Sequence, residues 1–142
     1  MSDDWQQAFE VAERTALEAG RLVMEGFRAS GSVSRKGKFD LVTEFDFASE
    51  ELIRDRIGAA FPSHRIVGEE GEASGEGAFV WYVDPIDGTV NFAHGHPYFC
   101  VSVALFREAE GLVGIVHAPA LGITWKAARG IGAFRNDEPC HV

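Results

Sequence analysis

Apolar residues recur at helical spacing over the first 29 residues of the chain. These positions are Trp5, Phe9, Ala12, Ala16, Ala19, Leu22, Val23 and Phe27. They fall three or four residues apart, which is the period of one face of an α-helix. Asp3 or Asp4 can cap the start of this helix, because a carboxylate accepts hydrogen bonds from the first N–H groups.

A second helical pattern begins near Thr43 and ends at Pro62. Thr43 and Asp46 have the spacing of a capping box, with Asp in place of the usual Glu. Proline cannot continue a helix, so Pro62 marks the end. Residues 30–38, between the two helices, are small and basic and predict a loop or a hairpin.

Short apolar runs typical of strands replace the helical pattern after Pro62. Ile66–Val67 predicts a short strand, and residues 78–83 predict a buried strand that ends on Asp84. Further strands are expected over 99–105, 111–117 and 123–128, with a hairpin around 130–136. Two helices followed by a mainly antiparallel sheet place the chain in the α+β class, with the helices packed on the sheet.

Composition narrows the possible functions. The chain has 142 residues, 46% of them hydrophobic and 25% charged, which fits one globular domain. Its net charge of −9 argues against nucleic acid or an anionic membrane as a partner. No apolar run approaches the roughly 20 residues that span a bilayer. Two cysteines make neither a disulfide framework nor a zinc site, so a cytoplasmic setting is expected.

The clearest chemical signal is the sequence Asp-Pro-Ile-Asp-Gly-Thr at residues 84–89. Asp84 and Asp87 can face the same point, and carboxylates this close repel each other unless a cation or a proton intervenes. Magnesium prefers oxygen ligands and binds between carboxylates and substrate phosphate. Thr89 lies at the start of a short predicted helix, where N–H groups favour phosphate. By itself the segment could also be a turn, because Asp-Pro and Asp-Gly pairs are common turn formers.

Glu69 and Glu70 follow another short strand. Adjacent residues in an extended chain point to opposite faces, so we expect the two carboxylates to have different roles. One can bind a metal ion directly, whereas the other acts through water or is simply solvated. Together with the two aspartates, they favour a magnesium-dependent phosphoryl-transfer site, which needs positioning and charge neutralisation.

The sequence WYVDPIDGTVNFAHGHPYFCVSVAL at residues 81–105, with Gly-Glu-Glu at 68–70, resembles the inositol monophosphatase family. Three weaker stretches agree in order and spacing, at residues 36–50, 61–70 and 130–137. The family belongs to the lithium-sensitive, magnesium-dependent phosphatases. The resemblance implies the first half of the layered αβαβα sugar-phosphatase fold.

The resemblance also implies metal ligands. Glu69, Asp84 and the backbone carbonyl of Ile86 would bind a first magnesium ion. Asp84 would bridge to a second ion, which Asp87 also binds. Glu70 would help to hold a further, weaker ion through water. Two or three magnesium ions and inhibition by lithium are therefore expected.

The remaining implied roles concern substrate and water. Gly88 and Thr89 would hold the substrate phosphate through backbone N–H groups. Thr89 paired with Asp46 would activate the attacking water. Lys36 matches a loop lysine near the site.

Members of the family are roughly twice as long as this chain, so residues 1–142 correspond to an N-terminal α+β half, with the C-terminal half absent. That half carries an aspartate that completes the second metal site, and Asp137 and Glu138 are poor substitutes. A homo-oligomer, or a chain that supplies the missing half, is the expected partner. Sheet surface that would pack against that half should be exposed, which favours association.

The leading interpretation is magnesium-dependent hydrolysis of a small phosphate monoester, an inositol monophosphate or a related sugar phosphate, by a metal-activated water. The alternative is a truncated, catalytically incomplete module that binds metal or oligomerises. An aspartyl-phosphate phosphatase is disfavoured, because its two aspartates are two residues apart and Asp84 and Asp87 are three apart.

Overall fold

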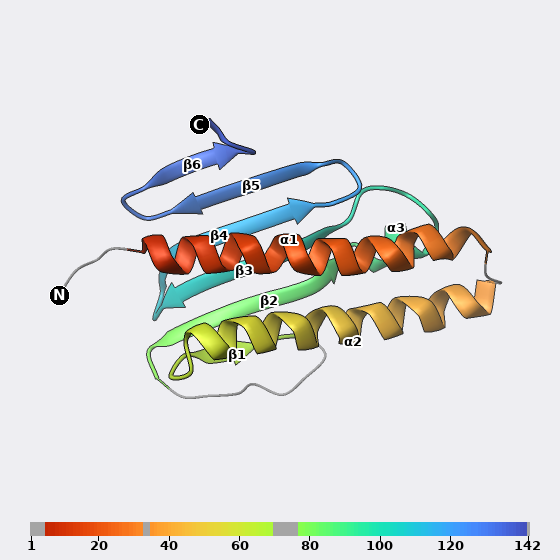
Figure 1. Ribbon diagram of the computed structural model, residues 1–142, viewed down its shortest axis with the longest axis horizontal. Helices are drawn as coiled ribbons and strands as arrows, with labels where there is room; N and C mark the ends of the chain where they lie inside the picture. Colours follow the sequence, from red (N-terminus) through yellow and green to blue (C-terminus); the bar gives the residue numbers. More distant parts are fainter. Residues whose placement is uncertain (1–4, 33–34, 70–76, 142) are drawn as a thin grey trace.

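The computed structural model describes residues 5–32, 35–69 and 77–141. In this part of the chain, two long helices lie side by side on one face of a seven-stranded sheet (Figure 1). The helices are α1 (Gln6–Ala29) and α2 (Arg35–Ala60), with the 3-10 turn η1 (Ser30–Ser32) after α1 and the short helix α3 (Thr89–Ala93) after β2. The strands are β1 (Arg65–Val67), β2 (Phe79–Asp87), β3 (Cys100–Arg107), β4 (Glu110–Ala118), β5 (Ile123–Ala128), β6 (Gly132–Arg135) and β7 (Glu138–Pro139).

Strand order in the sheet follows chain order from β1 to β7. Strands β1 and β2 are parallel, and every later neighbouring pair is antiparallel. The predicted strands over 99–105, 111–117 and 123–128 correspond to β3, β4 and β5. The predicted α+β class, with two helices on a mainly antiparallel sheet, is confirmed.

The core lies between the helices and the inner face of the sheet. Helix α1 presents Ala12, Ala16 and Ala19, all fully buried, so its backbone approaches the strands closely. On β3, Val101, Val103 and Leu105 are buried, whereas the residues between them are only partly buried. This period of two is the signature of a strand with one face in the core.

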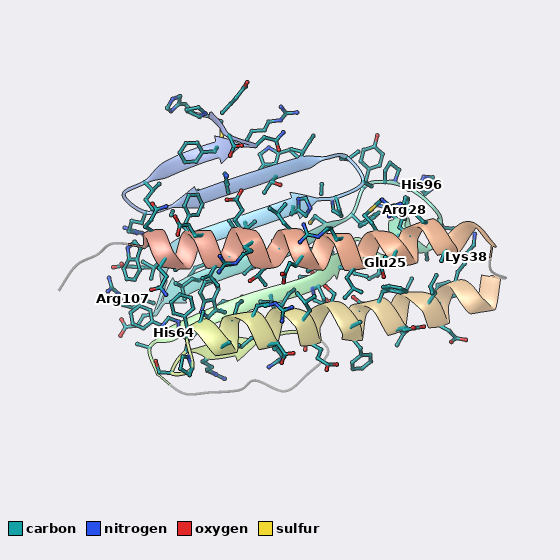
Figure 2. The ribbon with its side chains drawn as sticks, in the orientation of Figure 1. Glu25, Arg28, Lys38, His64, His96 and Arg107 are labelled. Carbon is teal, nitrogen blue, oxygen red and sulfur yellow. The ribbon has the colours of Figure 1, made fainter. Side chains whose placement is uncertain are left out.

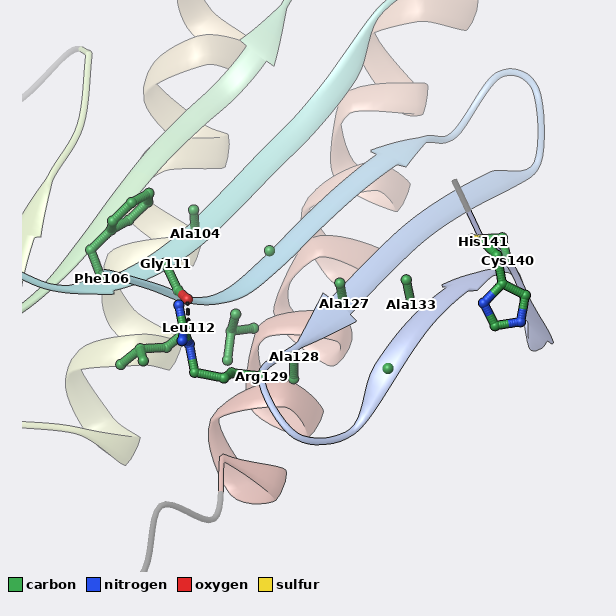
Figure 3. Close-up of a pocket in the computed structure, with 13 residues that line it drawn as sticks. Ala104, Phe106, Gly111, Leu112, Ala127, Ala128, Arg129, Ala133, Cys140 and His141 are labelled. Atoms are coloured by element: carbon green, nitrogen blue, oxygen red, sulfur yellow. Dashed lines mark hydrogen bonds between the residues drawn. The ribbon is translucent and has the colours of Figure 1, made fainter. Parts of the chain in front are cut away.

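The outer face of the sheet, opposite the helices, is not covered by the described residues. It exposes Tyr82, Val116 and Trp125 by 48%, 39% and 40%. A shallow cavity of about 730 Å³ lies on this face, and Figure 3 views it with the helices behind the sheet. Its floor is a row of small residues paired across four strands, Ala104, Gly114, Ala127 and Ala133. The expected exposure of sheet surface is therefore present.

Helix α2 begins earlier than the sequence pattern predicts. It already includes Arg35, so the predicted loop is wrong over residues 35–38 and the predicted cap at Thr43 is wrong, whereas residues 33 and 34 lie outside the described residues. The Thr43 hydroxyl donates to the Phe39 carbonyl one turn back, a bond that belongs inside a helix. Asp3 and Asp4, the predicted caps of α1, lie outside the described residues. The N-cap residue of α1 is Trp5, which makes no side-chain capping bond.

Strand β2 also differs from its predicted end. The apolar run predicts an end at Asp84, yet the strand continues through Pro85 to Asp87. Pro85 is compatible with this because the pairing with β3 is interrupted there, so no ladder N–H is required of it. The predicted helix near Thr89 is present as α3.

An aromatic cluster closes the end of the sheet where α1 begins, and Figure 2 labels His64 and Arg107 there. The His64 ring stacks between Phe61 and Phe79, with centroid distances of 4.8 and 4.9 Å. Trp81 Nε1 donates to His64 Nδ1 over 3.0 Å. An indole N–H can only donate, so this bond requires an unprotonated Nδ1. Burial lowers the pKa of His64, which keeps the ring neutral.

Two helix glycines provide a matched test of the packing. A Cβ on Gly20 would lie 2.5 Å from His117 Cδ2, whereas one on Gly58 would meet nothing within 4 Å. We expect Gly20→Ala to lower the free energy of unfolding by about 1–3 kcal/mol through overpacking. Gly58→Ala should raise it by up to about 1 kcal/mol, because alanine loses less backbone entropy in a helix. Urea titration of both variants measures this, and equal effects would contradict the close α1–β4 packing.

The His64–Trp81 bond predicts a pH dependence of stability. The pKa of folded His64 lies below its unfolded value near 6.5, so the unfolded chain binds more protons at acid pH. The contribution of His64 to stability is therefore fully present above pH 6.5 and is lost progressively as the pH falls below 6.5 and through the lower folded pKa. His64→Gln keeps an acceptor that does not titrate. Urea unfolding at pH 7.5 and 5.5 should show a larger loss for the parent chain; equal losses would contradict the neutral histidine.

Candidate active site

The acidic residues singled out by the sequence meet at one edge of the sheet. Because β1 and β2 are parallel, their carboxyl ends lie side by side. Glu69 follows the end of β1, and Asp84 and Asp87 lie at the end of β2. A cavity of about 390 Å³ opens there, and it is lined by Asp46, Glu69, Asp84, Ile86, Asp87, Gly88 and Thr89. These are the predicted site residues except Glu70, which lies outside the described residues.

A one-residue bulge in β2 decides which way the aspartates face. Asp84 pairs with Ser102 and Asp87 with Cys100, so β2 advances three residues while β3 advances two. In a regular strand, residues three apart point to opposite faces. The extra residue reverses this, because cross-strand partners share a face and Ser102 and Cys100 lie on the same one. Asp84 and Asp87 therefore share the outer face, while Pro85 and Ile86 are buried.

Helix α2 contributes a polar face to the site from the core side. Asp46, Ser49 and Glu50 are 6%, 0% and 3% exposed, and they lie one turn apart on the helix. Asp46 lines the cavity. Ser49 Oγ donates to the Pro85 carbonyl over 3.1 Å, and the Glu50 carboxylate pairs with Arg54 at 3.0 Å. The helix thus meets the strand at the bulge itself.

Gly88 connects the bulge to α3. Its φ of 91° lies in the left-handed region that favours glycine. A Cβ at this position would lie 2.9 Å from the Tyr98 carbonyl oxygen, so the backbone leaves no room for a side chain. This places Thr89, the first residue of α3, at the wall of the cavity.

The carboxylates of the cavity repel one another. Burial, together with the neighbouring charges of Glu69 and Asp87, raises the pKa of Asp84 to about 7. The closeness of the Glu69 side chain adds to this shift, because two neighbouring carboxylates favour a proton on one of them. Cys100 lies beside the group, with Sγ 3.8 Å from Asp87 Oδ2, and burial raises the pKa of its thiol to about 11. Cys100 is thus a neutral neighbour of the site.

The donor set of the cavity fits a hard divalent cation. Asp84 Oδ1 is buried and has no hydrogen-bond partner among the described residues. A buried carboxylate oxygen without a partner is costly, and a cation would satisfy it. Glu69 and Asp87 supply further oxygens of the kind that magnesium prefers. Within the described ranges, no three acidic, His or Cys side chains converge closely enough to form a ready-made metal cluster. The candidate ligands therefore line the cavity but do not converge on one metal position.

The sequence pattern does not identify two neighbours of the site: Ser49, which contacts it from the core side, and Cys100, which lies beside Asp87 on the outer face. Ser49 lies one turn after Asp46 on the same helix face, and that spacing is a usable signal. Lys36 was expected in a loop, but it lies within α2. Asp137 does not line this cavity. Its carboxylate instead pairs with Lys126 over 2.9 Å.

A sequence model described as the inositol monophosphatase family matches residues 4–142. The chain belongs to the inositol monophosphatase family. It is 41% identical to Inositol monophosphatase 2 of Solanum lycopersicum, over 96% of this chain and 54% of the relative. It is 43% identical to a histidinol-phosphatase of Chlorobaculum parvum, over 100% of this chain and 54% of the relative.

The solved structures agree with this family. The extragenic suppressor protein suhB of Bartonella henselae superposes with a TM-score of 0.85 at 33% identity, covering 96% of this chain and 54% of suhB. The chain therefore has the fold of the first part of inositol monophosphatase family proteins, and it spans about half the length of the curated relatives it matches. Among the described residues, no helix has the length and apolar character needed to cross a membrane.

Replacing Asp84 tests the electrostatics of the cavity. In the presence of a chelator and well above pH 7, where Asp84 carries its charge, Asp84→Asn should raise the free energy of unfolding by an amount on the order of 1 kcal/mol, because it removes a charge that Glu69 and Asp87 repel through partly screening solvent. Added Mn²⁺ should stabilise the parent chain and leave the variant unchanged.

Asp55→Asn is the matched control, since Asp55 is an exposed residue of the same helix as Asp46. Its stability should follow the parent chain with and without Mn²⁺. A parent chain that is more stable than Asp84→Asn in chelator would contradict the repulsion.

Proposed function

We propose that this site hydrolyses a small phosphate monoester with magnesium as cofactor. The observation that carries the proposal is the cavity itself, in which the carboxylates of Asp46, Glu69, Asp84 and Asp87 line one space of about 390 Å³. An anionic phosphate cannot enter such a space unless cations offset the carboxylates. The family and its phosphatase relatives support the same chemistry.

The cation ligands in this proposal are Glu69, Asp84 and the carbonyl of Ile86 for one ion, and Asp84 with Asp87 for a second. Glu70 would hold a third, weaker ion through water. Magnesium bound at such a site supplies positive charge to the phosphate oxygens and lowers the pKa of a bound water. The orphaned Asp84 Oδ1 supports this assignment, because its burial is costly without a cation.

Asp46 and Thr89 are the proposed proton-handling pair. Both line the cavity, and Asp46 is only 6% exposed. The Asp46 carboxylate accepts the proton of the Thr89 hydroxyl, and the Thr89 oxygen in turn accepts a proton from the attacking water. The water oxygen forms a bond to phosphorus as the ester P–O bond breaks, and the leaving alkoxide takes a proton from solvent. The N–H groups of Gly88 and Thr89 hold the phosphate oxygens.

The substrate class is a phosphorylated cyclitol, sugar or small alcohol. The relatives carry the names inositol monophosphatase and histidinol-phosphatase, which share a phosphate monoester and differ in the alcohol. The cavity residues bear on the phosphate and the ions, so they support the reaction type and not one alcohol.

Further polypeptide on the outer face of the sheet is part of the proposal. That face carries Asp84 and Asp87 together with the exposed Tyr82, Val116 and Trp125. The relatives have about twice the length of this chain. A second copy of this chain, or a chain that supplies the second half, would cover this apolar surface beside the ion site.

Phosphate release from inositol 1-phosphate, with magnesium titrated, tests the proposal. We expect the 142-residue chain to release phosphate only with magnesium. Asp84→Asn should lower the rate to background, and Asp46→Asn should lower it by about 10²–10⁴-fold as an acid–base residue would. Asp55→Asn, on an exposed part of α2, is the control and should leave the rate unchanged.

Two results would contradict the proposal. Turnover that persists in Asp84→Asn would place the chemistry elsewhere. Magnesium binding at Asp84 without turnover, at any chain concentration, would favour the alternative of a catalytically incomplete module that binds metal or oligomerises.

A further inference from the structure

The buried hydroxyl of Ser49 contacts the bulged segment of β2 that orients Asp84 and Asp87. Ser49 is fully buried in α2, and its Oγ donates to the Pro85 carbonyl over 3.1 Å. The two residues are 36 positions apart in the chain. Pro85 lies between Asp84 and Asp87, inside the one-residue bulge of β2.

The bulge interrupts the ladder where this bond is made. Asp84 and Asp87 pair with β3, while Pro85 and Ile86 fall between the two pairings and are buried. Buried carbonyl groups need a donor, and a missing one costs free energy. The Ser49 hydroxyl supplies that donor from the neighbouring layer, so it stabilises the bulged conformation over a regular strand.

A regular strand without the bulge would separate the two aspartates. A regular strand through residues 84–87 would turn Asp87 toward the core, because residues three apart then point to opposite faces. The two carboxylates would no longer border one cavity. The conformation that Ser49 stabilises is thus the one that gathers the proposed ligands.

We infer that Ser49 is a positioning residue for the divalent-cation site, acting through the Pro85 carbonyl on Asp84 and Asp87. The inference rests on the proposed function for the identity of the ligand, and on the bulge for the mechanism. Groups that orient metal ligands typically change metal affinity by 10–100-fold when they are removed. Ser49→Ala should therefore raise the dissociation constant for Mn²⁺ by roughly tenfold or more.

Ser30 offers a matched control. It is also a buried serine, 4% exposed, and its Oγ donates to the Phe27 carbonyl over 2.7 Å at the end of α1. Ser30→Ala removes the same kind of bond without touching β2. A purely structural role for Ser49 would make the two alanine variants alike in stability and in Mn²⁺ binding.

The experiment is an Mn²⁺ titration of the full 142-residue chain, followed by the electron paramagnetic resonance signal of the free ion. It compares the parent chain, Ser49→Ala, Ser49→Cys, Ser30→Ala and Asp84→Asn. Amide hydrogen exchange at residues 86–88 in metal-free protein is the second readout. Ser49→Cys keeps a weak donor of similar shape, so it tests the inference if the alanine variant does not fold.

The inference predicts graded affinity, with the parent chain tightest, Ser49→Cys intermediate and Ser49→Ala weakest. Ser30→Ala should bind as the parent does, and exchange at 86–88 should be faster in Ser49→Ala than in the parent chain or in Ser30→Ala. Equal affinity of the parent and Ser49→Ala would overturn the positioning role and leave the proposed function standing. A parent chain that binds Mn²⁺ no better than Asp84→Asn would overturn the proposed metal site, and this inference with it.

Discussion

The site depends on the alternation of side chains along β2 and on the one bulge that interrupts it. Side chains alternate along a strand, so Asp84 and Asp87 can border one cavity only if a residue is inserted between their pairings. The bulge between Ser102 and Cys100 of β3 provides that insertion. Bulges bend a strand and re-aim its side chains, and here the result is a group of like charges at the edge of the sheet.

Like charges held together need support from the rest of the fold. Helix α2 provides it through the buried Ser49, whose hydroxyl donates to the Pro85 carbonyl, although the same helix adds the buried carboxylate of Asp46 to the cavity. The same helix reaches β1, because the Glu50 carboxylate fills the space beside Gly68, one residue before Glu69. Two chain segments that carry acidic residues are therefore anchored on one helix face, which explains how a site assembled from distant parts of the sequence keeps its geometry.

The sequence predicts the parts that follow from local pattern and fails where long-range contacts decide. Helical periodicity predicts α1, and the acidic residues around 84–89 predict the cavity that they line. The predicted start of α2 is wrong because Thr43 is a residue type that caps helices, yet its hydroxyl donates to the Phe39 carbonyl inside the helix. The bulge could not be predicted, since it is a feature of the pairing with β3, and the Ser49 hydroxyl that bonds to it comes from 36 residues away.

A crystal of the chain grown with Mn²⁺ would show, through the anomalous signal of the ion, whether this cavity binds a divalent cation. We expect an anomalous peak in the cavity at the carboxyl ends of β1 and β2, bonded to Asp84 Oδ1, a buried oxygen that lacks a hydrogen-bond partner among the described residues. Glu69 or Asp87 should complete its contacts. An ordered cavity without a peak, with Asp84 hydrogen-bonded to water or protein instead, would contradict the claim that this bulge builds a cation site.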